Sequence, residues 1–304
     1  MTKLQRVLVA VDFSEPARTA FDHALALSRL HAAELIVVHA VPTDRKFNWH
    51  ARERIALIGS LRGAAQEAGV RFKVSVQQGD PAGVILLHAN SRRPDLIVLG
   101  SSERSGLDRF RFGSVAEIVA REATQPVLVV PAVAGRAVDS ITPFENILVA
   151  VDFGEGSREA VERALSMAKG DSRVTVVHVV RGVPLGYASR RLSHRMETEY
   201  QRHLIRDAWQ RIPETIPANA RTSPRVHARV VTGDPAVEIS RVAAETDADL
   251  ILVGVTARGP IGRLFMGSTA ARVIRAAGRP VLAIPRPVNK AAAPVREDRL
   301  PVAA

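Results

Sequence analysis

The chain has 304 residues and a formal net charge of +11, with 46% hydrophobic residues, only 4% aromatic residues and no cysteine. This length predicts two domains of about 150 residues each with cores of Val, Leu, Ile and Ala, and the missing cysteine excludes disulfides, a thiolate nucleophile and cysteine-ligated metals. Because the basic residues are scattered along both halves without an aromatic-interleaved basic motif, the positive charge does not favour a nucleic-acid partner.

The N-terminal segment "MTKLQRVLVAVDFSEP" contains no apolar region followed by a small-residue cleavage site, so it does not have the pattern of a secretion signal. No uninterrupted apolar run in the chain approaches the roughly 18 residues that cross a bilayer. We therefore expect a cytoplasmic protein without a membrane partner.

Short apolar runs alternate with helix-period segments along the first half of the chain. The runs are almost continuous in Val, Ile and Leu, as expected of parallel strands buried on both faces, and they read "RVLVAV", "ELIVVHAV", "FKVSVQ", "DLIVLG" and "PVLVVP". After Ser14 as the cap and Pro16 in the first turn, helical spacing is kept by Ala17, Ala20, Phe21, Ala24 and Leu27. This alternation predicts an α/β fold with right-handed crossovers and a doubly wound five-stranded parallel sheet.

The second half of the chain repeats the first. "RVLVAVDFSEPARTAFDHALALS" returns as "NILVAVDFGEGSREAVERALSMA", "LIVVHAV" as "VTVVHVV", and "QGDPAGVI" as "TGDPAVEI". The offset is 140 residues at Asp12 and Asp152 but 154 at Gly100 and Gly254, so the second copy carries about fourteen extra residues between its second and third strands. Part of this insertion is the stretch "SRRLSHRMETEYQRHLIRDAWQR", which has the pattern of a solvated amphipathic helix.

The repeat sets the domain boundaries. We predict domains at residues 1–132 and 144–286, each with its own five-stranded sheet, joined by a linker at 133–143 within the stretch "PAVAGRAVDSITPF". The tail, residues 287–304, lacks periodic apolar residues and is predicted to be disordered.

In doubly wound sheets, ligands bind outside the carboxyl ends of the strands, where the strand order reverses. Asp12 and Asp152 follow the first strand of each copy, where a carboxylate can accept hydrogen bonds from a ribose hydroxyl or a base amine, or cap the next helix. Spacing alone leaves both alternatives open. His39 and His178 near the end of each second strand have no partner evident in the sequence, which favours a satisfied core histidine over a general base.

The loop after the fourth strand ends at a helix start in both copies. It runs from Gly100 to Gly113 and Ser114, and from Gly254 to the sequence Gly267, Ser268, Thr269. The amides and dipole of a helix N-terminus favour an anion, whereas Ser is also a common N-cap residue. The long loop with glycines at both ends favours the anion. No P-loop, dinucleotide fingerprint, catalytic triad or metal cluster is present, so we predict neither catalytic nor metal-ligating residues.

Together these motifs carry a specific resemblance. The chain resembles a tandem universal stress protein, with two UspA-type domains in one polypeptide. The resemblance rests on "VLVAVDFS" and "ILVAVDFG", on "VVHAV" and "VVHVV", on the fourth-strand loops with their "GS", and on "PVLVVP" and "PVLAIP". It covers about residues 4–132 and 144–286, and it implies a sheet of the adenine-nucleotide alpha-hydrolase-like or flavodoxin-like kind in each domain.

The resemblance implies an ATP site, with Mg²⁺, in each copy. Asp12 and Asp152 would face the adenosine, and the backbone beside Ala40 and Val179 would contact the base. The residues implied to contact the phosphates are Gly100, Gly113 and Ser114 in one site, and Gly254, Gly267, Ser268 and Thr269 in the other. Members of this kind are stress-linked regulators with little or no turnover, at most slow ATPases, and other members bind no nucleotide.

One glycine of the family's G-x2-G-x9-G-S/T loop is missing in both copies, where Glu103 and Ala257 stand instead. Ala257 adds a methyl group, at a cost of about 1 kcal/mol if the position needs positive φ. A carboxylate at Glu103, about 4 Å from a phosphate charge, would cost about 1 kcal/mol in water and about 4 at an effective dielectric of 20. The nearby charges of Arg104, Arg109 and Arg111 offer compensation. These values favour ATP in the second copy.

The resemblance also implies assembly. The fifth strands of two domains pair at the sheet edge, which here would join "PVLVV" to "PVLAI" within the chain and cover both edges. A homodimer and an unidentified regulatory protein partner are compatible with the resemblance. The alternative to an ATP-binding regulator is a stress scaffold that binds no nucleotide and acts through protein partners.

Overall fold

The computed structural model describes residues 3–42, 51–101, 113–132, 144–182, 194–255 and 268–285. In the first half of the chain the elements are β1 (Arg6–Ala10), α1 (Glu15–His31), β2 (Glu34–Val41), α2 (Ala51–Glu67), β3 (Phe72–Gln78), α3 (Pro81–Arg92), β4 (Leu96–Gly100), α4 (Ser114–Glu122) and β5 (Val127–Val130). In the second half they are β6 (Asn146–Val151), α5 (Glu155–Met167), β7 (Arg173–Val180), α7 (His194–Thr215), a 3₁₀ turn (Ala218–Ala220), β8 (Val226–Thr232), α8 (Pro235–Glu245), β9 (Leu250–Val255), α9 (Ser268–Ala276) and β10 (Val281–Pro285).

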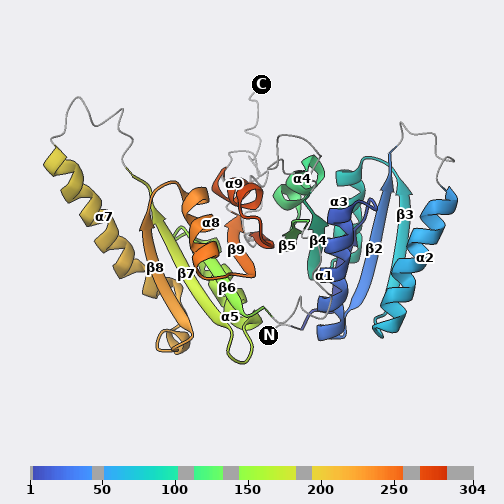
Figure 1. The fold of residues 1–304 in the computed structure, drawn as a ribbon, viewed down its shortest axis with the longest axis horizontal. Helices are drawn as coiled ribbons and strands as arrows, with labels where there is room; N and C mark the ends of the chain where they lie inside the picture. The colour runs from blue at the N-terminus through green and yellow to red at the C-terminus, as the bar shows by residue number, and fades with distance from the viewer. Residues whose placement is uncertain are drawn as a thin grey trace, which may run out of the picture.

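The strands of both halves form one sheet of ten strands in the order β3-β2-β1-β4-β5-β10-β9-β6-β7-β8. Each half contributes five parallel strands, so the predicted α/β, doubly wound architecture is confirmed. The halves meet where β5 and β10 pair antiparallel, with Leu128 opposite Leu282. Figure 1 shows the strands running across the molecule, with α4 and α9 near its centre and α2 and α7 at its two ends.

The predicted first helix is confirmed in detail. Ser14 is the N-cap of α1, its side chain accepts a hydrogen bond from the amide of Ala17, and Pro16 lies in the first turn. The apolar residues at helical spacing are all buried. Ala32 ends the helix in the left-handed conformation, where its amide donates to the carbonyls of Ser28 and Arg29.

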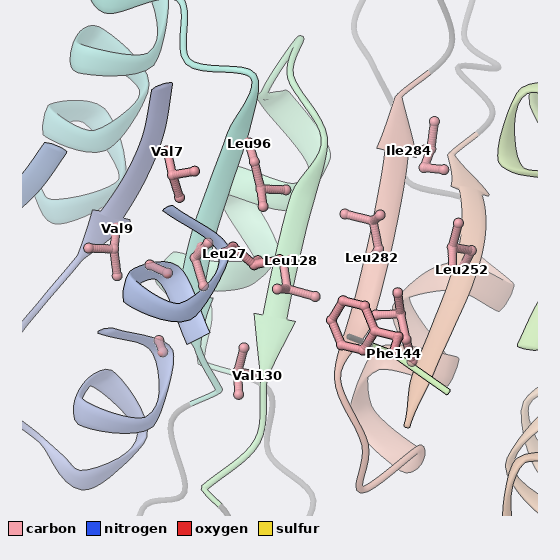
Figure 2. Packing of buried hydrophobic residues seen from close by; sticks show 14 of the residues in the cluster. Val7, Val9, Leu27, Leu96, Leu128, Val130, Phe144, Leu252, Leu282 and Ile284 are labelled. Atoms are coloured by element: carbon pink, nitrogen blue, oxygen red, sulfur yellow. The ribbon is translucent and has the colours of Figure 1, made fainter. Parts of the chain in front are cut away.

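Two hydrophobic cores, one on each face of the sheet, run across both halves. The first packs α1, α2, α5 and α7 against the sheet, and the second packs α3, α4, α8 and α9. At the seam, Leu128 on β5 and Leu282 on β10 point into the first core beside Phe144 (Figure 2). Phe144, the last residue of the stretch read as a linker, is only 5% exposed and therefore belongs to the packed core. The rest of that stretch from 133 onward and the tail 287–304 lie outside the described residues.

The amphipathic helix predicted within the insertion is confirmed as α7. Ala208 and Ile212 are buried, whereas Tyr200 and Trp209 are about half exposed. At 22 residues, α7 is longer than the 17-residue α2 that takes its place in the first half, and the 3₁₀ turn follows it. No helix that the structure describes, α7 included, is both long and apolar enough to cross a lipid bilayer.

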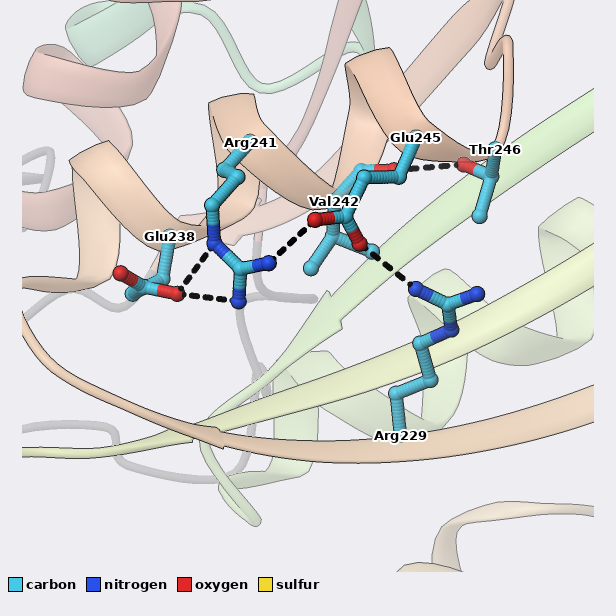
Figure 3. A network of polar contacts seen from close by, with 6 residues as sticks. All are labelled: Arg229, Glu238, Arg241, Val242, Glu245 and Thr246. Atoms are coloured by element: carbon cyan, nitrogen blue, oxygen red, sulfur yellow. Dashed lines mark hydrogen bonds and ion pairs between the residues drawn. The ribbon is translucent and has the colours of Figure 1, made fainter.

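Several arginines of the second half pair with carboxylates at the surface. Arg241 on α8 donates to Glu238 at 2.7 Å and also to Glu245, and Glu245 accepts from Arg229 of β8 at 3.0 Å (Figure 3). Arg229, Arg241 and Glu245 are a little under half exposed and only Glu238 is mostly covered, so each pair contributes little to stability. Their positive charge is locally balanced rather than gathered into a basic face.

Candidate nucleotide-binding crevices

Asp12 and Asp152 lie at the carboxyl ends of β1 and β6, and both side chains build the turn that follows. Oδ1 of Asp12 accepts from the amide and the hydroxyl of Ser14 at 3.0 and 2.5 Å. Oδ1 of Asp152 accepts from the amide of Gly154 at 2.9 Å and from the hydroxyl of Ser157 at 2.8 Å. Both residues are exposed, and within the described residues neither Oδ2 has a hydrogen bond. One oxygen therefore supports the helix entry while the other stays open to a ligand.

The residue after each aspartate has a conformation that is unusual for its type. Phe13 and Phe153 both have φ of 64°, in the left-handed region that costs a bulky residue roughly 1–2 kcal/mol. Each ring packs on a histidine of the next strand, with centroids 4.6 Å apart for Phe13 and His39 and 4.1 Å for Phe153 and His178. The same strained turn therefore follows the aspartate in both copies.

Both histidines have a structural hydrogen bond, as predicted; His39 is buried and His178 is half-buried. Nδ1 of His39 lies 2.8 Å from the carbonyl of Val11, and Nδ1 of His178 lies 2.9 Å from that of Val151. Because a carbonyl only accepts, Nδ1 must carry the proton. Burial lowers the pKa of His178, with Arg211 acting in the same direction and the Val151 carbonyl against it.

Ala40 and Val179 lie beside the aspartates at the same edge of the sheet. The register of β1 with β2 pairs Ala10 with Val38, and that of β6 with β7 pairs Val151 with His178. Continued past the strand ends, these registers bring Asp12 next to Ala40 and Asp152 next to Val179. The structure thus brings together, in each copy, the carboxylate and the strand end that were predicted to share a site.

Gly100 is the last residue of β4 and Gly254 the second-last residue of β9, and close backbone packing explains both. A Cβ on Gly100 would lie 2.5 Å from the carbonyl carbon and oxygen of Pro16 in the first turn of α1. A Cβ on Gly254 would lie 3.1 Å from the corresponding backbone atoms of Gly156 in α5. The sequence predicted only phosphate contact for these glycines and gave no sign of their packing against the first turns of α1 and α5.

Helices α4 and α9 begin at the predicted anion sites. The N-cap of α4 is Gly113, with φ of −63° and no side-chain cap, and Ser114 is the exposed first residue of the helix rather than its cap. The alternative that Ser114 serves as the N-cap is therefore wrong. Gly267, the side chain of Ser268, Glu103 and Ala257 lie outside the described residues.

The second half has a basic side chain at the carboxyl end of its sheet that the sequence did not single out. Arg181, directly after β7, donates from its guanidinium to Oγ1 of Thr269 in the first turn of α9, at 3.1 Å. The equivalent positions of the first copy are Pro42, at an offset of 139 residues, and Val115, at 154. Placing the two copies side by side would have revealed this difference, because a cation and a hydroxyl replace two apolar residues.

The family model described as "Universal stress protein family" matches residues 3–131 and 143–285. The chain belongs to the universal stress protein family. Universal stress protein YxiE of Bacillus subtilis is 33% identical over 144 residues, which cover 41% of this chain and 97% of that protein. Universal stress protein MJ0531 of Methanocaldococcus jannaschii is 30% identical over 138 residues, which cover 41% of this chain and 81% of that protein.

A solved structure shares the fold over almost the whole chain. The crystal structure of a universal stress protein from Archaeoglobus fulgidus superposes with a TM-score of 0.65 at 20% identity, covering 92% of this chain and 98% of that one. The curated universal stress proteins above each match about one of the two copies, whereas this structure spans both. The tandem organisation is therefore supported by the family model and by the fold.

Proposed function

We propose that this universal stress protein is a regulator that binds ATP with Mg²⁺ with little or no turnover, chiefly in the crevice of its second half. The observation that carries the proposal is the bond from Arg181 to Thr269 at the start of α9. It places a guanidinium beside a helix N-terminus, where amides and the helix dipole favour a phosphate. We further propose that the protein acts in the cytoplasm.

The parts of an adenine-nucleotide site surround this point. Asp152 keeps Oδ2 available for a ribose hydroxyl, and Val179 lies beside it at the end of β7. A guanidinium about 4 Å from a phosphate charge contributes about 1 kcal/mol in water and about 4 at an effective dielectric of 20. The first crevice has Pro42 and Val115 at the equivalent positions, and it carries Glu103 in its loop. Both differences favour the second crevice.

Low turnover fits the groups around the second crevice. His178 is the nearest candidate base on β7, but its Nδ1–H is held by the Val151 carbonyl and its ring packs on Phe153. Burial lowers its pKa, which makes it a weaker base than a free histidine. Within the described residues no group of three or more metal-ligating side chains forms a site, so Mg²⁺ would arrive with the phosphates.

A scaffold that binds no nucleotide is the second candidate function. Glu103 and Ala257 favour it, because both loops lack the glycine of the family's ATP-binding pattern. In that case the protein would act through an unidentified protein partner.

Isothermal titration of the full chain with Mg-ATP separates the two functions. We expect binding to one high-affinity site, which Arg181→Gln weakens about tenfold because a charged phosphate contact is lost. Thr269→Val tests the hydroxyl, and Arg158→Gln, an exposed arginine on α5, is the matched control without effect. Absence of heat up to millimolar Mg-ATP would refute the regulator and favour the scaffold. Binding that Arg181→Gln leaves unchanged would move the site to the first half.

A further inference from the structure

A cavity of about 300 Å³ lies at the seam between the two halves, on the face of the sheet covered by α1 and α5. This is the opposite face from α4 and α9, which pack in the other core and begin at the two nucleotide crevices. Both halves line the cavity, the first through α1 and β5 and the second through α5 and β10. Its volume is at the lower end of the roughly 300–1,000 Å³ of small-molecule sites.

The floor of the cavity is apolar. Leu128 and Leu282, the paired residues of β5 and β10, form it together with Leu27 and Phe144. Figure 2 shows these four side chains gathered on both sides of the seam. Each is at most 5% exposed, so the floor is shaped by well-packed residues.

Three polar atoms on the walls are buried without a hydrogen-bond partner in the described part of the chain. They are Nε2 of His31, Oε2 of Glu159 and Nε of Arg163. His31 is only 6% exposed. Glu159 and Arg163 pair with each other through Oε1 and a terminal guanidinium nitrogen at 3.6 Å, and this pair does not involve Oε2 or Nε. Buried polar atoms without partners are rare and destabilising, so three in one cavity require an explanation.

The polar wall does not follow from the repeat. At the offset of 140 residues, the equivalents of Glu159 and Arg163 are Thr19 and His23, and the equivalent of His31 is Asp171. His23 already bonds the carbonyl of Thr19 at 3.0 Å. Leu128 and Leu282 are equivalent residues of the two copies. The residues that carry the three polar atoms are instead replaced by other residue types at the equivalent positions.

We propose that this cavity binds an uncharged amphipathic small molecule, with an apolar body on the leucine floor and a hydroxyl or amide head group at the polar wall. Oε2 of Glu159 needs a donor and Nε–H of Arg163 needs an acceptor, and a hydroxyl or amide supplies both at neighbouring positions. Nε2 of His31 offers a further contact. This site is independent of the proposed nucleotide function.

The charges around the cavity argue against an ionised head group. An anion would meet the carboxylates of Asp95, Glu159 and Glu162, which line the cavity. Arg163 also lines the cavity and already pairs with Glu159, and the positive charges of Lys3 and Lys169 act on His31, where after burial they help to lower its pKa. The walls therefore carry charges of both signs. A neutral head group avoids both sets of charges.

The first experiment titrates the full chain with the fluorescent probe N-phenyl-1-naphthylamine, which is uncharged and carries one N–H donor. We expect saturable binding, and displacement by 3-phenylpropan-1-ol about tenfold more effectively than by propylbenzene, because the hydrocarbon leaves the polar wall unpaired. The anion 3-phenylpropanoate should displace the probe least. Absence of saturable binding, or equal displacement by alcohol and hydrocarbon, would overturn the proposal.

Variants locate the probe. Ser166→Phe places a ring in the cavity from a half-buried position of α5, and Arg163→Met removes the guanidinium, Nε included, and keeps an unbranched stem as far as the Nε position. Ser166→Phe should weaken probe binding about tenfold or more, because its ring fills the cavity. Arg163→Met should remove most of the tenfold advantage of 3-phenylpropan-1-ol over propylbenzene, because the alcohol oxygen loses the Nε–H donor. Arg158→Met, on the exposed side of the same helix, is the matched control and should bind like the parent protein. If both variants fold, by circular dichroism, and Ser166→Phe binds the probe normally while Arg163→Met keeps the preference for the alcohol, the site is not this cavity.

Discussion

At the residue scale, Gly100 is constrained both by its place beside the candidate nucleotide site and by close backbone packing. It ends β4 next to the nucleotide crevice, and a Cβ there would lie 2.5 Å from backbone atoms of Pro16, which cannot rotate away. Gly254 faces Gly156, where a Cβ would lie 3.1 Å from backbone atoms, a smaller overlap. The same glycine of the repeat is therefore under a stricter packing constraint in the first half than in the second.

This difference predicts unequal effects of alanine. Gly100→Ala should lower the free energy of unfolding by about 3 kcal/mol, the upper end of overpacking effects, and Gly254→Ala by about 1 kcal/mol. Urea denaturation of the full chain measures both variants against the parent protein. If Gly100→Ala keeps full stability, backbone packing does not explain the glycine, and the predicted contact with the phosphates would be the remaining explanation.

The residues of the candidate sites differ in how far the sequence could predict them. Asp12 and Asp152 could be placed at the crevices, because they directly follow strands whose apolar runs are easily recognised. The contact of Gly100 with Pro16 and the bond from Arg181 to Thr269 could not, since each joins residues that are distant in the chain. Pattern and spacing carry no information about how closely two backbones approach. The strained φ of Phe13 and Phe153 was missed for the same reason, since phenylalanine gives no sign of a left-handed turn.

At the scale of elements, the starts of α1 and α5 show how one helix entry is built in two ways. In the first half, Ser14 caps α1 with its side chain and also donates to Asp12. In the second half, the N-cap is Gly154 without a side-chain bond, and Ser157 of the first turn holds Asp152 instead. Each aspartate is therefore fixed by one hydroxyl, supplied from a different position of the helix.

The predicted consequence concerns the cap of α1. Ser14→Ala should lower the free energy of unfolding by about 1 kcal/mol, because the amide of Ala17 loses its acceptor. Ser14→Gly, which reproduces the N-cap of the second half, should lower it by only a few tenths of a kcal/mol. Thermal or urea unfolding of both variants provides the measurement. Equal losses for alanine and glycine would show that the hydroxyl bond to Asp12, rather than the cap, is the stabilising contact.

Most elements of the fold could be predicted from the sequence, because Val-rich runs indicate buried strands and capped amphipathic segments indicate helices. The cavity at the seam could not. Its floor needs Leu128 beside Leu282, and its wall needs α1 and α5 to face each other, which depends on how the two sheets join. Glu159 and Arg163 look in the sequence like an ordinary ion pair one helical turn apart, and only the structure shows their unpaired atoms.

At the scale of the whole molecule, the described residues join the two halves by a short strand pairing, an ion pair and the two shared cores. Three residue pairs join β5 to β10, and Arg275 of α9 pairs with Glu117 of α4 at 3.0 Å. The N–H of Ile97 donates to the carbonyl of Pro126, and that of Ser101 to the carbonyl of Val130, so these backbone groups of β5 face β4. By the alternation along a strand, Val127 and Val129 turn their backbone groups toward β10.

A chain cut within residues 133–143 tests this seam. The isolated first half would expose β5, whose four residues are all buried in the full chain, and an unpaired apolar edge strand favours pairing with a second copy. We therefore expect the first half to form a homodimer through antiparallel β5 strands, with a mass near twice that of the fragment by light scattering after gel filtration. Val129→Pro removes an N–H that faces β10 and leaves the bonds to β4 in place, so this variant of the fragment should be monomeric. A monomeric parent fragment would mean that β5 needs more than an open edge to pair, and that Arg275, Glu117 and the packing around the cavity hold the two halves together.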